Sequence, residues 1–395
     1  MKLTNLALLN ITVFLKSQSY LLPVMLLFYI QNGLTTADFF FFQGIVCFVE
    51  LLFGLPSGWL ADYFSKKTVL LFSYAMLFLR YALWLFFGGY AIILAGEICY
   101  AVYKSLFQST AEGYIYQYLC ENDEQKRNLS KYSYFNAAAS FGSALSAVIG
   151  ALLFKENGIT IVLIVQICIV SLGILLLCFI KPVRKAEYKK QGIRRSLVSF
   201  TELALKLKNS NLKFYIAISG IFAATTSLLL NTFQPLMHLG SVPVLFFGGI
   251  YFLNHITRAF SGLYTYKILS LISLRKLGLI SYIANISVFL VMYLIIKNNF
   301  NFLIVPLLII ACLCIAVQLS FNIGIVSLLQ KHTKIGNRSM MASFNNTFIR
   351  VASGLILVLN TYFVQNFGLL YEPVLGILFI GGTIFLLQNL PDRRN

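Results

Sequence analysis

The segment Leu55-Pro56-Ser57-Gly58-Trp59-Leu60-Ala61-Asp62-Tyr63-Phe64-Ser65-Lys66-Lys67 joins two long apolar stretches, at about 37–60 and 68–88. Each stretch holds roughly the 20 apolar residues that a membrane-crossing helix needs. Outward from this segment, further apolar stretches lie at about 5–29, 90–118, 130–154, 158–180, 213–237, 243–266, 276–296, 301–329, 339–364 and 372–390. The sequence therefore predicts an all-α integral membrane protein with twelve transmembrane helices.

The composition supports a lipid environment for the whole chain. Of the 395 residues, 59% are hydrophobic and only 11% are charged, whereas a soluble domain carries about 25% charged residues. The seven cysteines form no Cys-x-x-Cys pair and the three histidines lie far apart, so the sequence predicts no metal site and no cofactor.

Basic residues indicate which ends of the spans face the cytoplasm. With the N-terminus inside, the inside segments carry 24 of the 31 Lys and Arg residues, and the outside loops carry only Lys155 and Lys297. This bias follows the positive-inside rule and predicts that both termini are cytoplasmic, in what we expect to be a bacterial inner membrane. Orientation and attraction to lipid headgroups account for the net charge of +18, so no nucleic-acid partner is predicted.

The two halves of the chain repeat each other. An Asn-x-Ser sequence followed by Phe-Asn at 128–136 recurs 209 positions later at 337–345, and the same offset maps Lys66-Lys67 onto Arg275-Lys276. Repeated halves are a common way to build alternating access in transporters. The repeat predicts two pseudo-symmetric six-helix bundles, at 1–180 and 213–395, joined by a basic cytoplasmic linker at 181–212.

The opening segment resembles the loop signature of the major facilitator superfamily: Gly, three residues, Asp and then a basic cluster. Gly58, Asp62, Lys66 and Lys67 occupy its positions, although the family usually has Arg and Gly where this chain has Tyr63 and a serine. The resemblance implies the major facilitator fold and transport by alternating access. Gly58 would let helices approach closely, and Asp62 would accept hydrogen bonds that close a cytoplasmic gate. The alternative is a charged turn that only sets topology.

A second segment, 109–119, resembles a fourth-span pattern of a drug-efflux-like branch of this superfamily. That pattern typically ends in Tyr-Asp, but Gln117 replaces the Asp. The fifth-span signature of drug/proton antiporters is missing, and Gly142, Ser146 and Gly150 there form a small-xxx-small face that we expect to serve packing.

Eight ionisable residues fall well inside predicted spans. Each costs about 3 kcal/mol to insert, so some of them should serve function. They are Lys16, Glu50, Arg80, Glu97, Lys104, Glu112, Arg258 and Arg350.

Polar stripes on the first, fourth, seventh and tenth spans are the predicted substrate cavity, because the resemblance implies that these spans line it. The cavity residues are Lys16, Glu97, Lys104, Gln108, Asn231, Gln234, Gln318 and Asn322. Glu97 and Glu112 are the proton-coupling candidates, because burial of a carboxyl group favours its protonated form. The alternative is that Glu97 and Lys104, two turns apart on one face, form a structural ion pair.

The sequence thus predicts a secondary active transporter that moves a small organic molecule, is coupled to protons, exports its substrate and works as a monomer. Nucleotide-binding Walker A, HExxH and GxSxG motifs are absent from the sequence, which disfavours a transport ATPase or an enzyme. The alternative function is a non-transporting membrane receptor or scaffold that binds a partner through its basic central loop.

Overall fold

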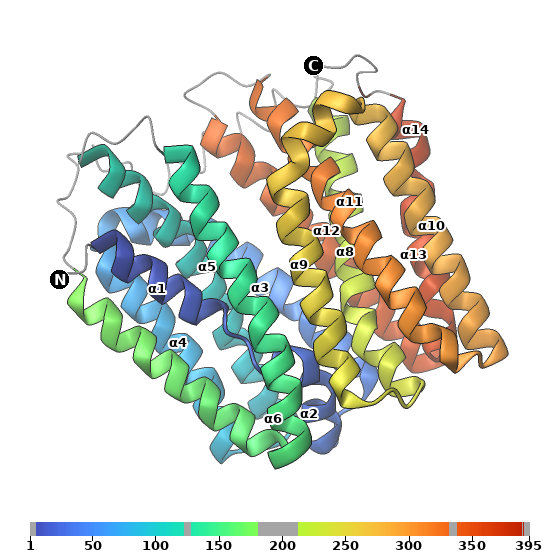
Figure 1. The fold of residues 1–395 in the computed structure, drawn as a ribbon, viewed down its shortest axis with the longest axis horizontal. Coiled ribbons are helices and arrows are strands. Elements are labelled where there is room, and N and C mark those ends of the chain that lie inside the picture. The colour runs from blue at the N-terminus through green and yellow to red at the C-terminus, as the bar shows by residue number, and fades with distance from the viewer. Residues whose placement is uncertain (1–4, 122–127, 181–211, 332–337, 389, 391–395) are drawn as a thin grey trace. The chain divides into compact units, whose positions relative to one another are not determined.

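The computed structural model describes residues 5–121, 128–180, 212–331, 338–388 and 390, and these form helices joined by short turns, with no strand among them. Apolar runs in lipid must satisfy their own backbone hydrogen bonds, and helices do so within one segment. The elements of the first half are α1 (Asn5–Ser17), η1 (Leu22–Val24), α2 (Met25–Gln31), α3 (Thr36–Tyr63), α4 (Lys66–Phe86), α5 (Tyr90–Glu121) and α6 (Asn128–Phe179) (Figure 1). Those of the second half are α8 (Leu212–Leu239), α9 (Val244–Leu271), α10 (Leu274–Asn298), η3 (Asn301–Leu303), α11 (Ile304–Lys331), α12 (Arg338–Phe367), η5 (Leu369–Tyr371), α13 (Glu372–Gly381) and α14 (Thr383–Leu387).

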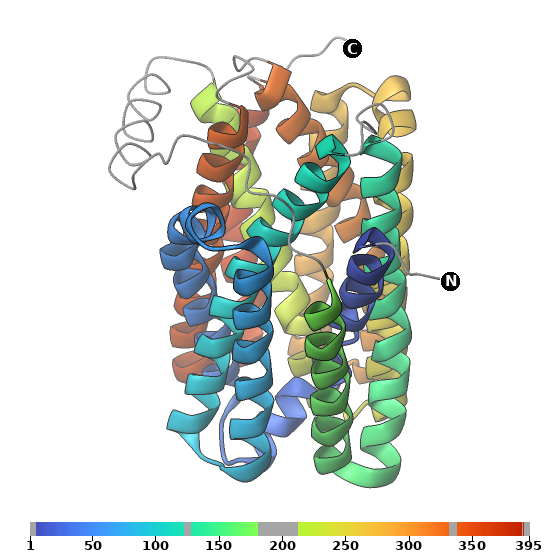
Figure 2. The ribbon, with the colours of Figure 1, turned by 90° about the vertical axis from the view of Figure 1, so that its left-hand side faces the viewer.

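The helices fit the predicted number of membrane crossings. Ten described segments are long and apolar enough to cross a membrane, and the longest, Ala139–Phe179, has 41 residues. Gly158 interrupts that segment with φ 73° and ψ −172°, and Figure 2 shows α6 as two arms joined at one end, so α6 holds two crossings. The 28-residue α9 is outside the ten, but at 1.5 Å per residue it spans about 42 Å, enough for a crossing. The predicted all-α membrane fold is confirmed.

Contacts along the chain divide it into two units. The first comprises residues 1–34 and 49–196, and the second comprises 35–48 and 197–395. The N-terminal part of α3 therefore packs with the second unit, where Gly44 and Gly354 mark a close approach of α3 and α12. The predicted linker at 181–212 lies outside the described residues except for its last position, so the predicted domain boundaries stay a prediction.

In the first unit, α1 packs along α6 and α4 packs against α5 and α6. The small face on α6 makes the first of these contacts possible. A side chain at Gly150 would collide with the backbone of Tyr20, and the Ser146 hydroxyl accepts a hydrogen bond from the Ser19 backbone at 3.0 Å. Gln166 on the second arm of α6 accepts from the Tyr20 backbone at 2.9 Å. These contacts confirm the predicted packing role and satisfy backbone groups where α1 ends.

In the second unit, α8 packs against α11 and α12, α9 against α11, and α10 against α11 and α13. An apolar cluster occupies its interior, in which the rings of Phe222 and Phe321 lie 4.9 Å apart. Hydroxyl groups join α9 to α11: Ser261 and Ser320 share a hydrogen bond of 2.7 Å, and Thr265 donates to Ser320 at 3.2 Å. Each unit therefore combines an apolar interior with a few buried polar contacts.

Candidate functional site: polar groups buried in each unit

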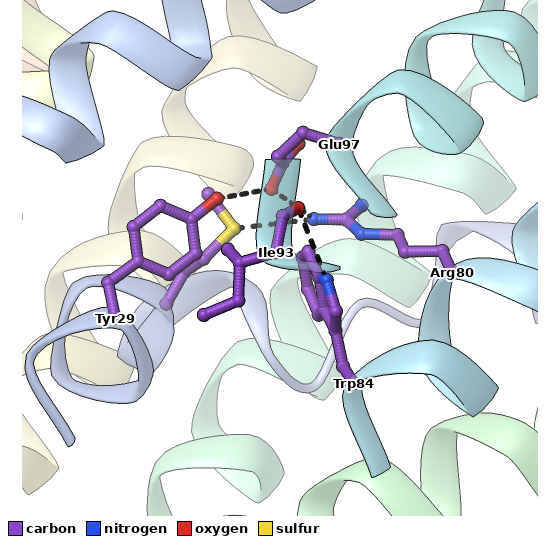
Figure 3. A network of polar contacts seen from close by, with 6 residues as sticks. Tyr29, Arg80, Trp84, Ile93 and Glu97 are labelled. Carbon is purple, nitrogen blue, oxygen red and sulfur yellow. Dashed lines mark hydrogen bonds and ion pairs between the residues drawn. The ribbon is translucent and has the colours of Figure 1, made fainter. Parts of the chain in front are cut away.

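Among the described side chains of the first unit, the most completely buried charges meet at Glu97 on α5. Its Oε1 accepts a hydrogen bond of 2.5 Å from the Tyr29 hydroxyl of α2 and forms an ion pair of 2.8 Å with Arg80 of α4. Figure 3 shows the three side chains converging from different helices. The Glu97 side chain is 0% exposed and that of Arg80 is 4% exposed, so water does not screen this pair.

The turn between α4 and α5 brings the two charges together. α4 ends at Phe86 and α5 begins at Tyr90, so Arg80 lies six residues before one end and Glu97 seven residues after the other. In two antiparallel helices joined by a short turn, residues at similar distances from the turn lie at the same depth in the membrane, so Arg80 and Glu97 lie level with each other. The ion pair therefore depends on the pairing of two helices rather than on spacing within one helix.

Aromatic rings enclose the cation of this pair. The Arg80 guanidinium lies 4.3 Å from the Trp84 ring and 4.1 Å from the Tyr100 ring. Trp84 is held in turn by a hydrogen bond of 3.3 Å from its Nε1 to the Ile93 carbonyl, and its ring covers Gly96, where no side chain would fit. Such desolvated cation–π contacts contribute roughly 2 kcal/mol each. Arg80 is thus fixed by stacking as well as by its carboxylate.

A second ion pair of the first unit joins α3 to α5. Lys104 Nζ lies 2.6 Å from Glu50 Oε1, with the lysine side chain 34% exposed and the carboxylate 4% exposed. The suggestion that Glu97 and Lys104 pair with each other is therefore wrong, because each binds a partner on a neighbouring helix. The seven-residue spacing placed them on one face but left them two turns apart.

Lys16 of α1 also contacts α5. Its ammonium lies 4.7 Å from the ring of Phe107, a cation–π contact inside the first unit. The side chain is half-buried.

The predicted polar residues of the second unit take part in amide and hydroxyl contacts. Gln318 of α11 is fully buried, donates to the Phe222 carbonyl and to Thr225 of α8, and accepts from Asn285 of α10 at 3.1 Å. Gln318 thus joins three helices.

The other three predicted polar residues of this unit have fewer contacts. Gln234 of α8 donates to the Tyr251 hydroxyl of α9 at 3.0 Å. Asn231 donates to the Ser227 carbonyl of its own helix at 2.8 Å. The Asn322 side-chain oxygen is buried without a hydrogen-bonding partner among the described residues.

Comparison with known proteins decides the family. The profile of the Major Facilitator Superfamily matches residues 6–357 of the chain, well over half of its length. The chain belongs to the major facilitator superfamily. The predicted family is therefore confirmed, and this member of the superfamily is a secondary transporter in the membrane and not an enzyme.

Solved structures share the fold of this major facilitator protein. A nucleoside transporter, NupG, matches with a TM-score of 0.78 and 14% identity over 98% of both chains. A D-xylose-proton symporter matches with 0.71 and 11% over 98% of this chain and 97% of the other. A POT family transporter in complex with a thioalcohol conjugated peptide matches with 0.74 and 13%, over 97% and 95%. A search among curated proteins finds no match. Identities this low establish the fold alone.

Part of the predicted major facilitator site lies outside the described side chains. The side chains of Gly58, Asp62, Gln108 and Glu112 are among these, so their roles stay predictions. Lys67 of the gate motif is described, and its Nζ donates to the Cys178 carbonyl at the end of α6 at 2.6 Å. A cation there complements the negative end of the helix dipole. Its neighbour Lys66 begins α4 and is half-buried.

Sequence reasoning missed two features of the site. Arg80 was recognised as an intramembrane charge, but neither its ion pair with Glu97 nor the Tyr29 hydrogen bond to the same carboxylate was predicted. Glu372 was not counted at all, because it stands at the very start of the last apolar stretch, yet it is fully buried. Among the described residues, no group of three His, Cys, Asp or Glu side chains could hold a metal ion.

Proposed function

We propose that this major facilitator protein is a proton-coupled secondary transporter that exports a small organic molecule by alternating access. The observation that supports coupling is the carboxylate of Glu97, which is 0% exposed and held by Arg80 and Tyr29. An ionisable carboxyl group buried inside a membrane protein is costly to place there, and this cost supports a functional use. The proposal includes cytoplasmic termini, as the positive-inside rule predicts, a bacterial inner membrane as the location, and action as a monomer.

Protonation of Glu97 would change the forces that hold three helices together. The ionised carboxylate attracts the Arg80 guanidinium at 2.8 Å, whereas the neutral acid retains only hydrogen bonds. Loss of one partner of a buried ion pair costs about 3–5 kcal/mol. Binding of a proton by Glu97 therefore changes which packing of α2, α4 and α5 is most stable. A conformation in which the neutral acid is favoured becomes more populated at low pH.

The proposed substrate contacts come from the predicted polar residues of each unit. Those of the first are Lys16, Lys104 and Gln108, and those of the second are Asn231, Gln234, Gln318 and Asn322. Amide groups and ammonium groups in apolar surroundings bind the polar part of a small organic molecule. Export as the direction rests on the resemblance of segment 109–119 to the drug-efflux-like branch.

Growth of cells on a panel of toxic amphipathic compounds tests the proposal. We compare the wild type with Asp62→Asn, Glu97→Gln and, as a matched control, Glu156→Gln, whose carboxylate is 65% exposed. Export predicts resistance to at least one compound for the wild type and the control, lost in the other two variants at equal membrane abundance. Addition of that compound to everted vesicles with an acidic lumen should then release lumenal protons.

Other outcomes separate the alternatives. Resistance to nothing, together with accumulation of a polar metabolite driven by a pH gradient, would show uptake instead of export. Resistance without proton release would refute proton coupling. A phenotype that is lost on deleting 181–212 but retained in Asp62→Asn and Glu97→Gln would identify a receptor or scaffold and overturn the proposal.

A further inference from the structure

Another buried carboxyl group lies in the second unit, at the start of the last membrane crossing. Glu372 is the first residue of α13, and it contacts Thr232 of α8 through its Oε1. Both residues are 0% exposed. The other carboxyl oxygen, Oε2, has no hydrogen-bonding partner among the described residues.

Glu372 differs from Glu97 in having no cation beside it among the described side chains. The helices packed against α13 are α8, α10, α12 and α14, with η5 before it. The described charged or imidazole side chains on these elements are Lys213, His238, Arg275, Lys276, Lys297 and Arg350, and none forms an ion pair with Glu372. An isolated ionised carboxylate in an apolar interior is so unfavourable that the group takes up a proton instead.

The start of α13 does not supply the missing stabilisation. Pro373 follows Glu372 and has no N–H group to donate. No backbone hydrogen bond to the Glu372 carboxylate occurs among the described residues, so the carboxyl group is left with Thr232 alone.

The geometry at Thr232 indicates where a proton resides. Its hydroxyl oxygen lies within hydrogen-bonding reach of two acceptors, the Leu228 carbonyl at 2.8 Å and Glu372 Oε1. A hydroxyl has one proton and two lone pairs, so it cannot donate fully to both. If Glu372 is protonated, its O–H donates to Thr232, and the Thr232 hydroxyl donates to Leu228. Both contacts are then satisfied.

A pocket lies close to this pair, although neither Thr232 nor Glu372 lines it. It has a volume of about 520 Å³, and its lining includes Pro235 and Leu369. These residues stand three positions after Thr232 and three positions before Glu372, about one helical turn from the pair on each side. By the predicted orientation, this is the outer end of both helices.

We propose that Glu372 is a proton-binding site of the second unit, occupied by a proton in this conformation and exchanging it through the neighbouring pocket. This inference deepens the proposed proton coupling and rests on it for its role in transport, but not for the protonation itself. A proton leaving Glu372 creates a charge without a counterion between α8 and α13. Deprotonation therefore requires these helices to admit water or a cation.

Infrared spectroscopy of the purified, lipid-reconstituted protein at neutral pH tests the proposal directly. A protonated carboxyl group has a C=O stretching band that ionised carboxylates lack. We expect a wild-type band that is lost in Glu372→Gln and retained in the exposed control Glu156→Gln. Thr232→Val keeps the side-chain shape but removes the hydrogen bond, so it should move the band to higher frequency.

The outcomes are distinct from those of transport assays, because the spectrum needs neither substrate nor gradient. A wild-type spectrum unchanged by Glu372→Gln would overturn the proposal, since Glu372 would then be ionised. Loss of the band on adding sodium chloride would also overturn it, in favour of a cation site. An intact band in a protein that transports nothing would refute only the proposed function.

Discussion

Replacement of Arg80 by Gln should destabilise the first unit more than almost any other single change. The variant leaves the Glu97 carboxylate, 0% exposed, without its cation, which costs about 3–5 kcal/mol. It also removes the contacts with the Trp84 and Tyr100 rings at 4.3 Å and 4.1 Å, worth roughly 2 kcal/mol each when desolvated. Solvent screening does not reduce these figures, because both charges are buried.

A second substitution separates the charge effect from the lost packing. Glu97→Gln alone leaves Arg80 unpaired and should also be strongly destabilising. In the double variant Arg80→Gln/Glu97→Gln, however, no uncompensated charge remains. We therefore expect the double variant to be more stable than Arg80→Gln by about 3 kcal/mol, so that adding a mutation restores stability.

The assay is equilibrium unfolding in mixed micelles of increasing sodium dodecyl sulfate fraction, followed by tryptophan fluorescence. The chain has two tryptophans, so a Trp59→Phe background leaves Trp84, beside Arg80, as the reporter. Glu156→Gln, at an exposed pair, should be indistinguishable from the background. If the two single effects add within about 0.5 kcal/mol in the double variant, the pair is not coupled and the reasoning is refuted.

Two further predictions concern packing and polar contacts. Gly150→Ala should lower the free energy of unfolding by about 1–3 kcal/mol, because the methyl group would collide with the Tyr20 backbone. Gly249→Ala is the control and should have no such effect, because no neighbour lies within 4 Å of the added methyl group. Equal unfolding midpoints for the two variants would contradict this prediction. Gln318→Leu should cost about 1–3 kcal/mol in the same unfolding assay, because Asn285 loses its buried acceptor, and replacing Asn285 by Leu as well should recover part of that loss.

Helix phase could narrow down the candidate site but not assign partners within it. Glu97 and Lys104 stand seven residues apart on α5, and this spacing is compatible both with a shared cavity face and with an ion pair. Only the positions of neighbouring helices show that Arg80 of α4 binds the first and Glu50 of α3 binds the second. The predicted substrate residues rest on their helical phase and stay a prediction, which transport measurements on their variants test.

The sequence by itself determined that the chain lies in a lipid membrane, and it also determined the class of fold and the family. Apolar runs of about 20 residues can only be helices in lipid, the uneven distribution of Lys and Arg predicts their orientation, and the segment from Gly58 to Lys67 carries the resemblance to the major facilitator superfamily. Each of these features is contained in one stretch of sequence or is a sum over residues, so none depends on how the helices pack. The partners of buried ionisable groups were decided only by the tertiary structure, as Arg80 with Glu97 and Thr232 with Glu372 show. A charge in lipid is satisfied by whichever group packing brings within about 3 Å, and that depends on helix pairing, which no single stretch of sequence contains.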